Sequence, residues 1–221
     1  MSIANNLNKI KNTLPEHVTL VAVSKTKPIS DLMEAYNAGQ RIFGENKIQE
    51  MTDKYEEMPK DIQWHMIGHV QTNKVKYMAP YVSLIHGVDS FKLLKEINKQ
   101  AAKNNRIINC LLQIHIAEEE TKFGLDEAEL DEMLKQIQHD KETFRNIKIA
   151  GLMGMATFTE NQNQIKKEFL RLKSIFDKLN TEHFKLNTLS MGMSGDYELA
   201  ISCGSTMVRI GSSIFGNRNY Q

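Results

Sequence analysis

The sequence predicts an α/β fold, a single (β/α)8 TIM barrel with an extra N-terminal helix. Short apolar runs alternate with amphipathic helical stretches along the chain, as expected when helices surround a parallel sheet. The apolar runs are mostly continuous, which is typical of strands buried on both faces. No linker rich in Pro, Gly or Ser interrupts the 221 residues, so residues 1–221 are expected to form one domain. A doubly wound open sheet is the alternative, less favoured because the alternation persists to the C-terminus.

Eight apolar runs give the expected strands of the barrel. They span 18–23, 41–43, 63–67, 82–86, 107–114, 147–152, 187–190 and 207–210. Residues 1–14 carry apolar side chains at helical spacing and predict the extra helix. After the first strand, Ser30 and Asp31 are expected to cap a helix that Gly39 ends. Segments 89–103, 126–140 and 163–180 place apolar residues every three or four positions and predict further helices.

Composition excludes several function classes. Lys and Arg number 28 against 27 Asp and Glu, so no basic excess points to nucleic acid or to an anionic membrane surface. No apolar run reaches membrane-spanning length, and the N-terminus lacks the apolar block of a secretory signal. Cys110 and Cys203 are too few for a metal cluster or a disulfide framework. We therefore expect a reduced, cytoplasmic protein without a metal site.

Two glycine-rich segments near the C-terminus predict an anion site. "SMGMSGDYELAI" and "GSTMVRIGSSIFG" each place Gly and Ser after a short strand and before a helix or turn. Backbone N–H groups, a helix dipole and hydroxyl groups can converge there on a phosphate. In barrels of this kind, the loops after strands seven and eight are a recurrent phosphate site. Neither segment fits a P-loop or a dinucleotide-binding fingerprint, and ordinary glycine-rich turns are the simpler interpretation.

The first strand ends in a pair of lysines, within "VAVSKTKPIS". Side chains alternate along a strand, so Val21, Val23, Lys25 and Lys27 share one side. If that side faces the barrel axis, Lys25 lies at the mouth, where low dielectric disfavours an ammonium ion and makes the amine nucleophilic. A solvated lysine at a strand end is the simpler interpretation. An amine and a phosphate site at one mouth together favour a phosphorylated aldehyde as ligand.

Several motifs closely resemble the pyridoxal phosphate homeostasis proteins, also called the YggS or PROSC family. The matching stretches are "VAVSKTKP", "FGEN", "WHMIGHVQTNK", "SMGMSGDYELAI" and "GSTMVRIGSSIFG", which occur in family order from about residue 18 to 218. The resemblance implies a barrel like the N-terminal domain of alanine racemase that binds pyridoxal 5'-phosphate (PLP). The sequence departs from the family pattern at His115, where asparagine is usual, and at Lys47, where an aromatic residue is common.

The resemblance also implies roles for individual residues. Lys25 would form a Schiff base with PLP, and Asn46 would line the site near the cofactor ring. The phosphate would contact Ser194 and the backbone N–H groups of Gly211 and Ser212. Arg209 would face the pyridine nitrogen, where a permanent positive charge disfavours protonation and weakens the ring as an electron sink.

Three functional classes follow: a PLP carrier or buffer in vitamin B6 homeostasis, a racemase-like PLP enzyme with weak activity, and an interaction scaffold. The scaffold leaves the lysine and phosphate motifs without a purpose. Alanine racemase adds a C-terminal β-domain and a tyrosine base from its partner subunit, and this chain ends soon after its eighth strand. We therefore expect a non-enzymatic carrier, monomeric, that exchanges PLP with apo PLP-enzymes. The sequence leaves the role of Lys27 open.

Overall fold

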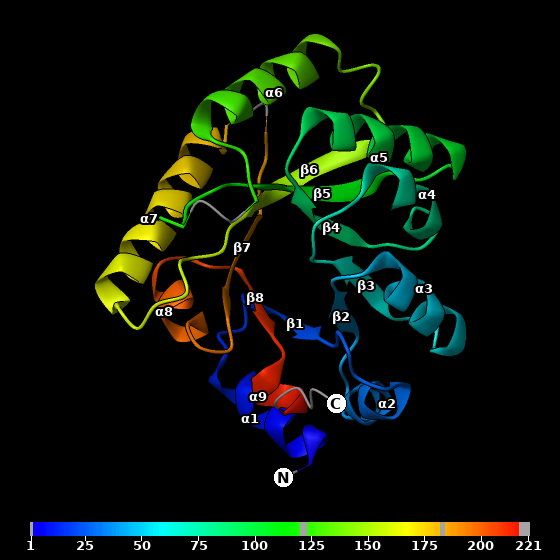
Figure 1. Cartoon of the computed structure of the whole chain (residues 1–221), viewed down its shortest axis with the longest axis vertical. Helices are drawn as coiled ribbons and strands as arrows, with labels where there is room; N and C mark the ends of the chain where they lie inside the picture. The colour runs from blue at the N-terminus through cyan, green and yellow to red at the C-terminus, as the bar shows by residue number, and fades with distance from the viewer. Residues whose placement is uncertain (1, 120–122, 182–183, 217–221) are drawn as a thin grey trace.

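The computed structural model describes residues 2–119, 123–181 and 184–216. Within them, parallel strands pair in chain order from β1 to β8, and β8 pairs with β1 to close a barrel (Figure 1). The strands are β1 Thr19–Val23, β2 Ile42–Glu45, β3 Gln63–Met66, β4 Leu84–Val88, β5 Ile108–Gln113, β6 Ile147–Met153, β7 Thr188–Met193 and β8 Met207–Ile210. The predicted (β/α)8 barrel is confirmed, and the open sheet is not formed.

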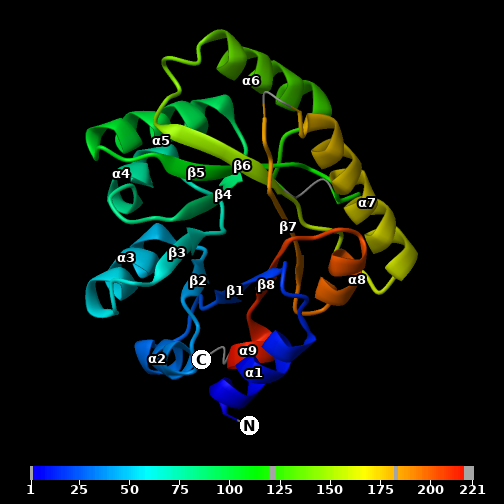
Figure 2. The ribbon, with the colours of Figure 1, turned by 180° about the vertical axis from the view of Figure 1, so that it is seen from behind.

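Helices surround the strands, as Figure 2 shows from the opposite side. They are α1 Ile3–Thr13, α2 Ile29–Asn37, α3 Ile48–Glu57, α4 Val75–Met78 after a 3-10 turn at Thr72–Lys74, α5 Phe91–Lys103, α6 Glu127–His139, α7 Gln162–Leu179, α8 Tyr197–Ser202 and α9 Ser212–Phe215. The extra N-terminal helix is α1, which lies beside α9 and donates a hydrogen bond to it, from Asn6 Nδ2 to Ile214 O at 3.1 Å. No helix in the described part of the chain is long and apolar enough to cross a bilayer.

Two local predictions need correction. The helix after β1 begins at Ile29 with Pro28 as its N-cap, so Ser30 is not the cap. Pro28 makes no side-chain capping hydrogen bond; its ring fixes φ, here −69°, and Asp31 N–H donates to the Pro28 carbonyl at 3.1 Å to begin the helix. Strand β7 extends to Met193 instead of ending at residue 190. Gly39 ends α2 as predicted, in the left-handed region at φ 88°.

The core has two parts because strand side chains alternate between the barrel interior and the surrounding helices. The larger part lies between strands and helices and includes Trp64 and Phe43. The smaller part lies inside the barrel and consists of Val21, Leu84, Leu111, Ala150, Met153 and Met207. Two residues further along their strands, His86 and Arg209 follow Leu84 and Met207 into the interior. A layer of polar side chains therefore lies between this interior apolar cluster and the mouth of the barrel.

Candidate functional site

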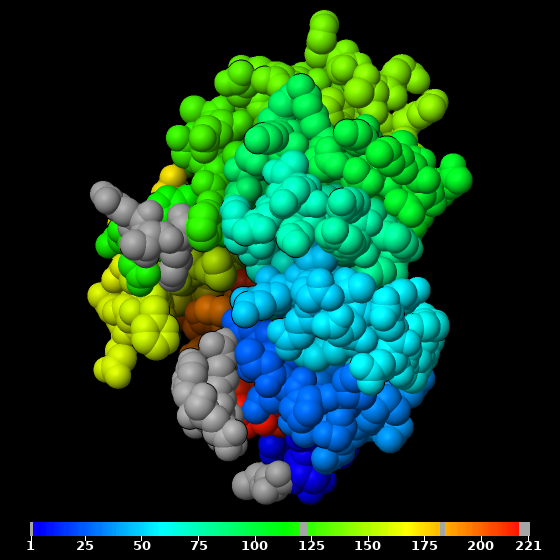
Figure 3. All heavy atoms as spheres, turned by 45° about the vertical axis from the view of Figure 1, so that its right-hand side comes forward, coloured from blue at the N-terminus to red at the C-terminus, as the bar shows by residue number. Residues whose placement is uncertain are grey.

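A cavity of about 530 Å³ opens at the carboxyl ends of the strands. In Figure 3 the surface is hollowed between the yellow residues near the start of α7 and the blue N-terminal residues. The structure brings every residue of the predicted site to this cavity: Lys25, Asn46, Ser194, Arg209, Gly211 and Ser212. The site is thus assembled from β1, β2, β7 and β8, as the barrel fold requires, and the individual roles stay predictions.

The two lysines that follow β1 both line the cavity, on the side that the sequence analysis predicted for them. Val21 belongs to the interior cluster, and Val23 lines the cavity with Lys25 and Lys27. The amine of Lys27 makes a hydrogen bond to the last helix, because Lys27 Nζ donates to Phe215 O in α9 at 2.9 Å. Lys27 is therefore held toward α9, on the C-terminal wall of the cavity.

The wall after β7 and β8 has the form of an anion cradle. Gly211 N–H donates to Ser194 Oγ at 3.3 Å, joining the two glycine-rich segments. A Cβ atom on Gly211 would lie 3.1 Å from Val23 O, so glycine lets the end of β8 approach β1 closely. Ser212 begins α9, and N–H groups in the first turn of a helix have no acceptor within it. Hydroxyl and amide groups therefore meet at one wall, as phosphate binding requires.

The cavity is also lined by a buried cation without a carboxylate hydrogen-bond partner among the described residues. Arg209 is 4% exposed. Its Nη1 donates to Ser190 Oγ at 2.6 Å and to Ser190 O at 2.9 Å, and its Nη2 donates to Gly154 O at 3.1 Å. Burial lowers the pKa of Arg209 to about 10, with Asp196 opposing the shift. The guanidinium therefore stays charged at neutral pH, fixed by neutral oxygens.

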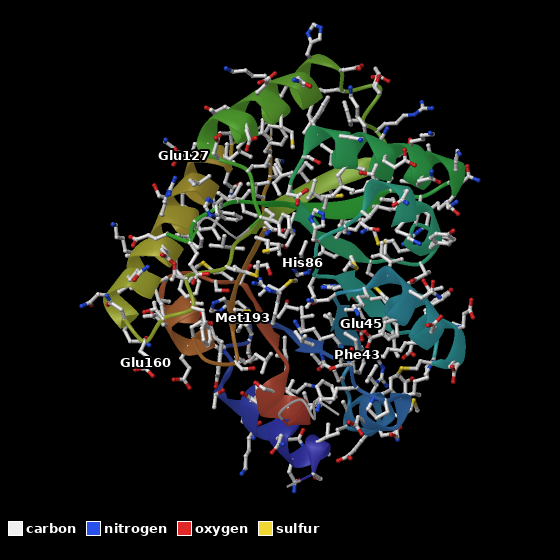
Figure 4. The ribbon with its side chains drawn as sticks, viewed as in Figure 1. Phe43, Glu45, His86, Glu127, Glu160 and Met193 are labelled. Carbon is white, nitrogen blue, oxygen red and sulfur yellow. The ribbon has the colours of Figure 1, made fainter. Side chains whose placement is uncertain are left out.

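Two buried histidines continue this hydrogen-bonded chain away from Arg209. Ser190 Oγ lies 3.1 Å from His86 Nδ1, and His86 Nε2 lies 3.1 Å from His65 Nδ1. Figure 4 places His86 toward the barrel axis. Burial lowers the pKa of His65 to about 3, and burial, then His65 and Arg209, lower the pKa of His86 well below its usual value. Both rings are therefore neutral at pH 7.

With both rings neutral, the chain can run in one direction from Arg209 to His65. Because Arg209 donates to Ser190 Oγ, the serine hydroxyl is free to donate to His86 Nδ1, which leaves the His86 proton on Nε2 facing His65. Each of these contacts then pairs one donor with one acceptor, and no second positive charge lies beside Arg209. The sequence analysis did not identify this hydrogen-bonded chain, because its contacts join strands that are distant in sequence. The sequence did contain one indication of this contact: the alternation of side chains along β3 and β4 directs both His65 and His86 into the barrel.

A second buried polar cluster lies outside the barrel, beneath the turn that carries Lys25. Lys54 of α3 pairs with Glu45 at 2.7 Å, and Glu45 lies beside α3 in Figure 4. Neither residue was anticipated from the sequence, where Lys54 reads as a solvated helix position. The two departures from the family pattern lie elsewhere: Lys47 is the exposed N-cap of α3, and His115 Nε2 lies 2.9 Å from Glu119 O.

Comparison with known proteins places this barrel among close relatives. The model of the alanine racemase N-terminal domain family matches residues 1–219. A pyridoxal phosphate homeostasis protein of Haemophilus influenzae is 38% identical over 235 residues, covering 100% of this chain and 98% of the relative. One of Aquifex aeolicus is 41% identical over 203 residues, covering 91% of this chain and 87% of the relative.

Solved structures with a similar fold include a member of the same group of proteins and an alanine racemase. PipY of Synechococcus elongatus, solved with PLP bound, has a TM-score of 0.89 at 34% identity and covers 97% of this chain and 100% of that chain. Alanine racemase of E. faecalis has a TM-score of 0.79 at 17% identity, covering 98% of this chain and 58% of that chain. The second likeness concerns the fold alone.

Proposed function

The chain belongs to the family of pyridoxal phosphate homeostasis proteins, which share the fold of the alanine racemase N-terminal domain, and from this premise we propose that it binds PLP at the barrel mouth. The whole chain, residues 1–221, would act as one PLP-binding domain. The observation that carries the proposal is the cavity that joins Lys25, the cradle around Ser194 and Gly211, and the buried Arg209. PLP carries an aldehyde, a phosphate and a pyridine nitrogen, and the cavity offers a partner for each.

The residues of the cavity fit the three groups of the cofactor. When bound, PLP supplies an aldehyde that condenses with a primary amine, forming a C=N bond and releasing water. Lys25 supplies the amine. Ser194, Gly211 and Ser212 hold the phosphate, and Asn46 lines the ring. The hydrogen bonds of Arg209 to Ser190 and Gly154 use Nη1 and Nη2, and a permanently charged guanidinium that faces the pyridine nitrogen would disfavour protonation of that nitrogen.

We further propose that the protein carries or buffers PLP and is not a racemase. Among the described residues, the titratable side chains that line the cavity are Lys25, Lys27, Asp196 and Arg209. Racemisation needs a proton donor and an acceptor on opposite faces of the substrate. Asp196 accepts the Met193 N–H at 2.6 Å and serves the turn before α8. The relatives are likewise named for homeostasis rather than for a reaction.

We further propose partners and a compartment for the carrier role. PLP would pass to apo PLP-enzymes, and the protein would act as a monomer in the cytoplasm, without nucleic acid or membrane partners. The two cysteines are buried and free, which suits a reducing compartment.

Absorbance titration with PLP tests the proposed site. Lys25→Ala should abolish the aldehyde-derived absorbance change, whereas Lys27→Ala, the matched control two residues away, should retain it. Equal loss in both variants, or retention in Lys25→Ala, would contradict the assignment. To separate carrier from racemase, the loaded protein is incubated with L-alanine, and the D-isomer is measured. Formation of D-alanine at ordinary enzymatic rates, about 1 s⁻¹ or more, would exclude the non-enzymatic role.

A further inference from the structure

The turn that carries Lys25 has an unusual backbone. Thr26, between the two lysines, has φ 63°, in the left-handed region. A β-branched residue rarely adopts this conformation, because its Cβ crowds the following carbonyl group. Lys27 N–H donates to Ser24 O at 3.1 Å and closes the turn. Such a conformation persists only where the surroundings hold it.

The surroundings are a buried cluster formed by Lys54 of α3, Glu45 of β2 and Glu50 of α3. The Lys54 ammonium group donates to Ser24 O at 2.8 Å, to Glu45 Oε1 at 2.7 Å and to Glu50 Oε1 at 2.7 Å. Its side chain is 6% exposed and that of Glu45 is fully buried. One ammonium group thus serves two carboxylates and the carbonyl that directly precedes Lys25.

The carboxylates in turn hold the rest of the turn. Glu50 Oε1 accepts the Thr26 N–H at 2.6 Å, and Glu45 Oε1 accepts the Ser24 hydroxyl at 2.6 Å. Ser24 and Thr26 flank Lys25 in sequence, and both are tied to the same cluster. Because side chains alternate, Ser24 points to the cluster outside the barrel while Lys25 points into the cavity.

If the cluster served only to pack α3 against β2, the ion pair between Glu45 and Lys54 would be sufficient. The contacts from Lys54 to Ser24 O and from Glu50 to Thr26 N–H add nothing to that packing, because they reach the β1–α2 turn. They fix the backbone on each side of Lys25. Lys27, beyond the left-handed residue, is directed to Phe215 O instead.

We propose that Lys54, Glu45 and Glu50 are positioning residues that hold the left-handed turn at Thr26, so that Lys25 and not Lys27 presents its amine to PLP. This inference rests on the proposed function. It assigns a purpose to the buried ion pair and explains how the site chooses between two neighbouring lysines. When the cluster is removed, Thr26 relaxes to an ordinary φ, and the directions of both lysine side chains change.

The test measures which lysine is labelled. Protein loaded with PLP is reduced with borohydride, digested, and the ratio of phosphopyridoxyl adduct on Lys25 to that on Lys27 is read by peptide mass mapping. Glu50→Ala removes the acceptor of the Thr26 N–H and leaves the Glu45–Lys54 pair intact. The double variant Glu45→Gln/Lys54→Met removes the buried pair without stranding one charge. Lys99→Met, which removes an exposed helix lysine paired with Glu96, is the matched control.

Both cluster variants should lower the ratio about tenfold, the order expected when one left-handed residue is released, and Lys99→Met should leave it unchanged. Thr26→Gly in the Glu50→Ala background should restore part of the ratio, because glycine adopts positive φ without strain. Glycine at this position also relieves strain in the folded protein, so thermal unfolding is measured on the same variants, and a labelling ratio that recovers when the unfolding temperature does not separates positioning from a structural role.

The outcomes are distinguishable. If the wild-type protein gives no adduct on either lysine, the proposed function fails. If wild type labels Lys25 and the folded variants keep the wild-type ratio, the positioning inference fails while the function stands. Circular dichroism and thermal unfolding report folding. Unfolding of both cluster variants would make the cluster a general stability element and would also overturn the inference.

Discussion

The buried histidines predict a steep loss of stability in mild acid. In the unfolded chain His65 titrates near pH 6.5, whereas burial lowers the pKa of His65 in the folded protein to about 3. Between these values the unfolded state binds the proton and the folded state does not. Stability is therefore fully present above pH 6.5 and falls as the pH drops toward 3.

The magnitude follows from the same two pKa values. Lowering the pH from 7 to 5 should cost about 2 kcal/mol of unfolding free energy through His65 alone, with the loss approaching about 1.4 kcal/mol per pH unit. His86, whose pKa burial also lowers, adds a loss of the same sign. Glu45 acts in the opposite direction, because burial raises its pKa and the folded state takes up the proton first.

Urea denaturation at pH 7 and at pH 5 measures this loss. His65→Gln keeps a polar side chain inside the barrel and removes one titrating group, so the difference between the two pH values should shrink by about 2 kcal/mol. His17→Gln, at an exposed position, should leave the difference unchanged. Comparing pH differences cancels any constant cost of the substitution. An unchanged difference in His65→Gln would refute the neutral, buried state of the ring.

Three further predictions concern PLP affinity, each measured by absorbance titration. Ser194→Ala removes one hydroxyl from the phosphate wall and should weaken binding about tenfold, the value of a typical hydrogen bond; unchanged affinity would remove Ser194 from the site. Arg209→Gln should weaken binding by tenfold or more, because a charged donor contributes about 1.5–3 kcal/mol; equal affinity would count against its contact with the ring. Gly211→Ala should weaken binding, because its Cβ would lie 3.1 Å from Val23 O; inorganic phosphate should compete with PLP in the wild type and less effectively in this variant.

The sequence predicted the barrel well because its determinants are local. Continuous apolar runs identify strands buried on both faces wherever they occur, and Gly39 ends α2 as its conformational freedom suggests. The alternation that directs Val21 and Val23 inward is equally local, whereas Lys25 and Lys27 follow the strand in a turn with a left-handed residue between them. The predicted start of α2 was wrong, and the reason is also local: Pro28, rather than Ser30, occupies the N-cap.

The polar layers could not be predicted, because their partners are brought together only by closure of the barrel. His65, His86 and Ser190 come from β3, β4 and β7, and their contacts appear only when the strands surround a common axis. Lys54 has the sequence context of a solvated helix residue, yet it is buried against Glu45. Lysine is rarely buried unless it is paired, and the sequence around Lys54 does not show that Glu45 will be its partner.

The central claim is that Lys25 is the lysine that holds PLP at the barrel mouth. Borohydride reduction of the loaded wild-type protein, followed by peptide mass mapping, tests it most directly. We predict one dominant phosphopyridoxyl adduct, on the peptide that contains Lys25. An adduct confined to another lysine, or none under conditions that label a known PLP protein, would contradict the claim.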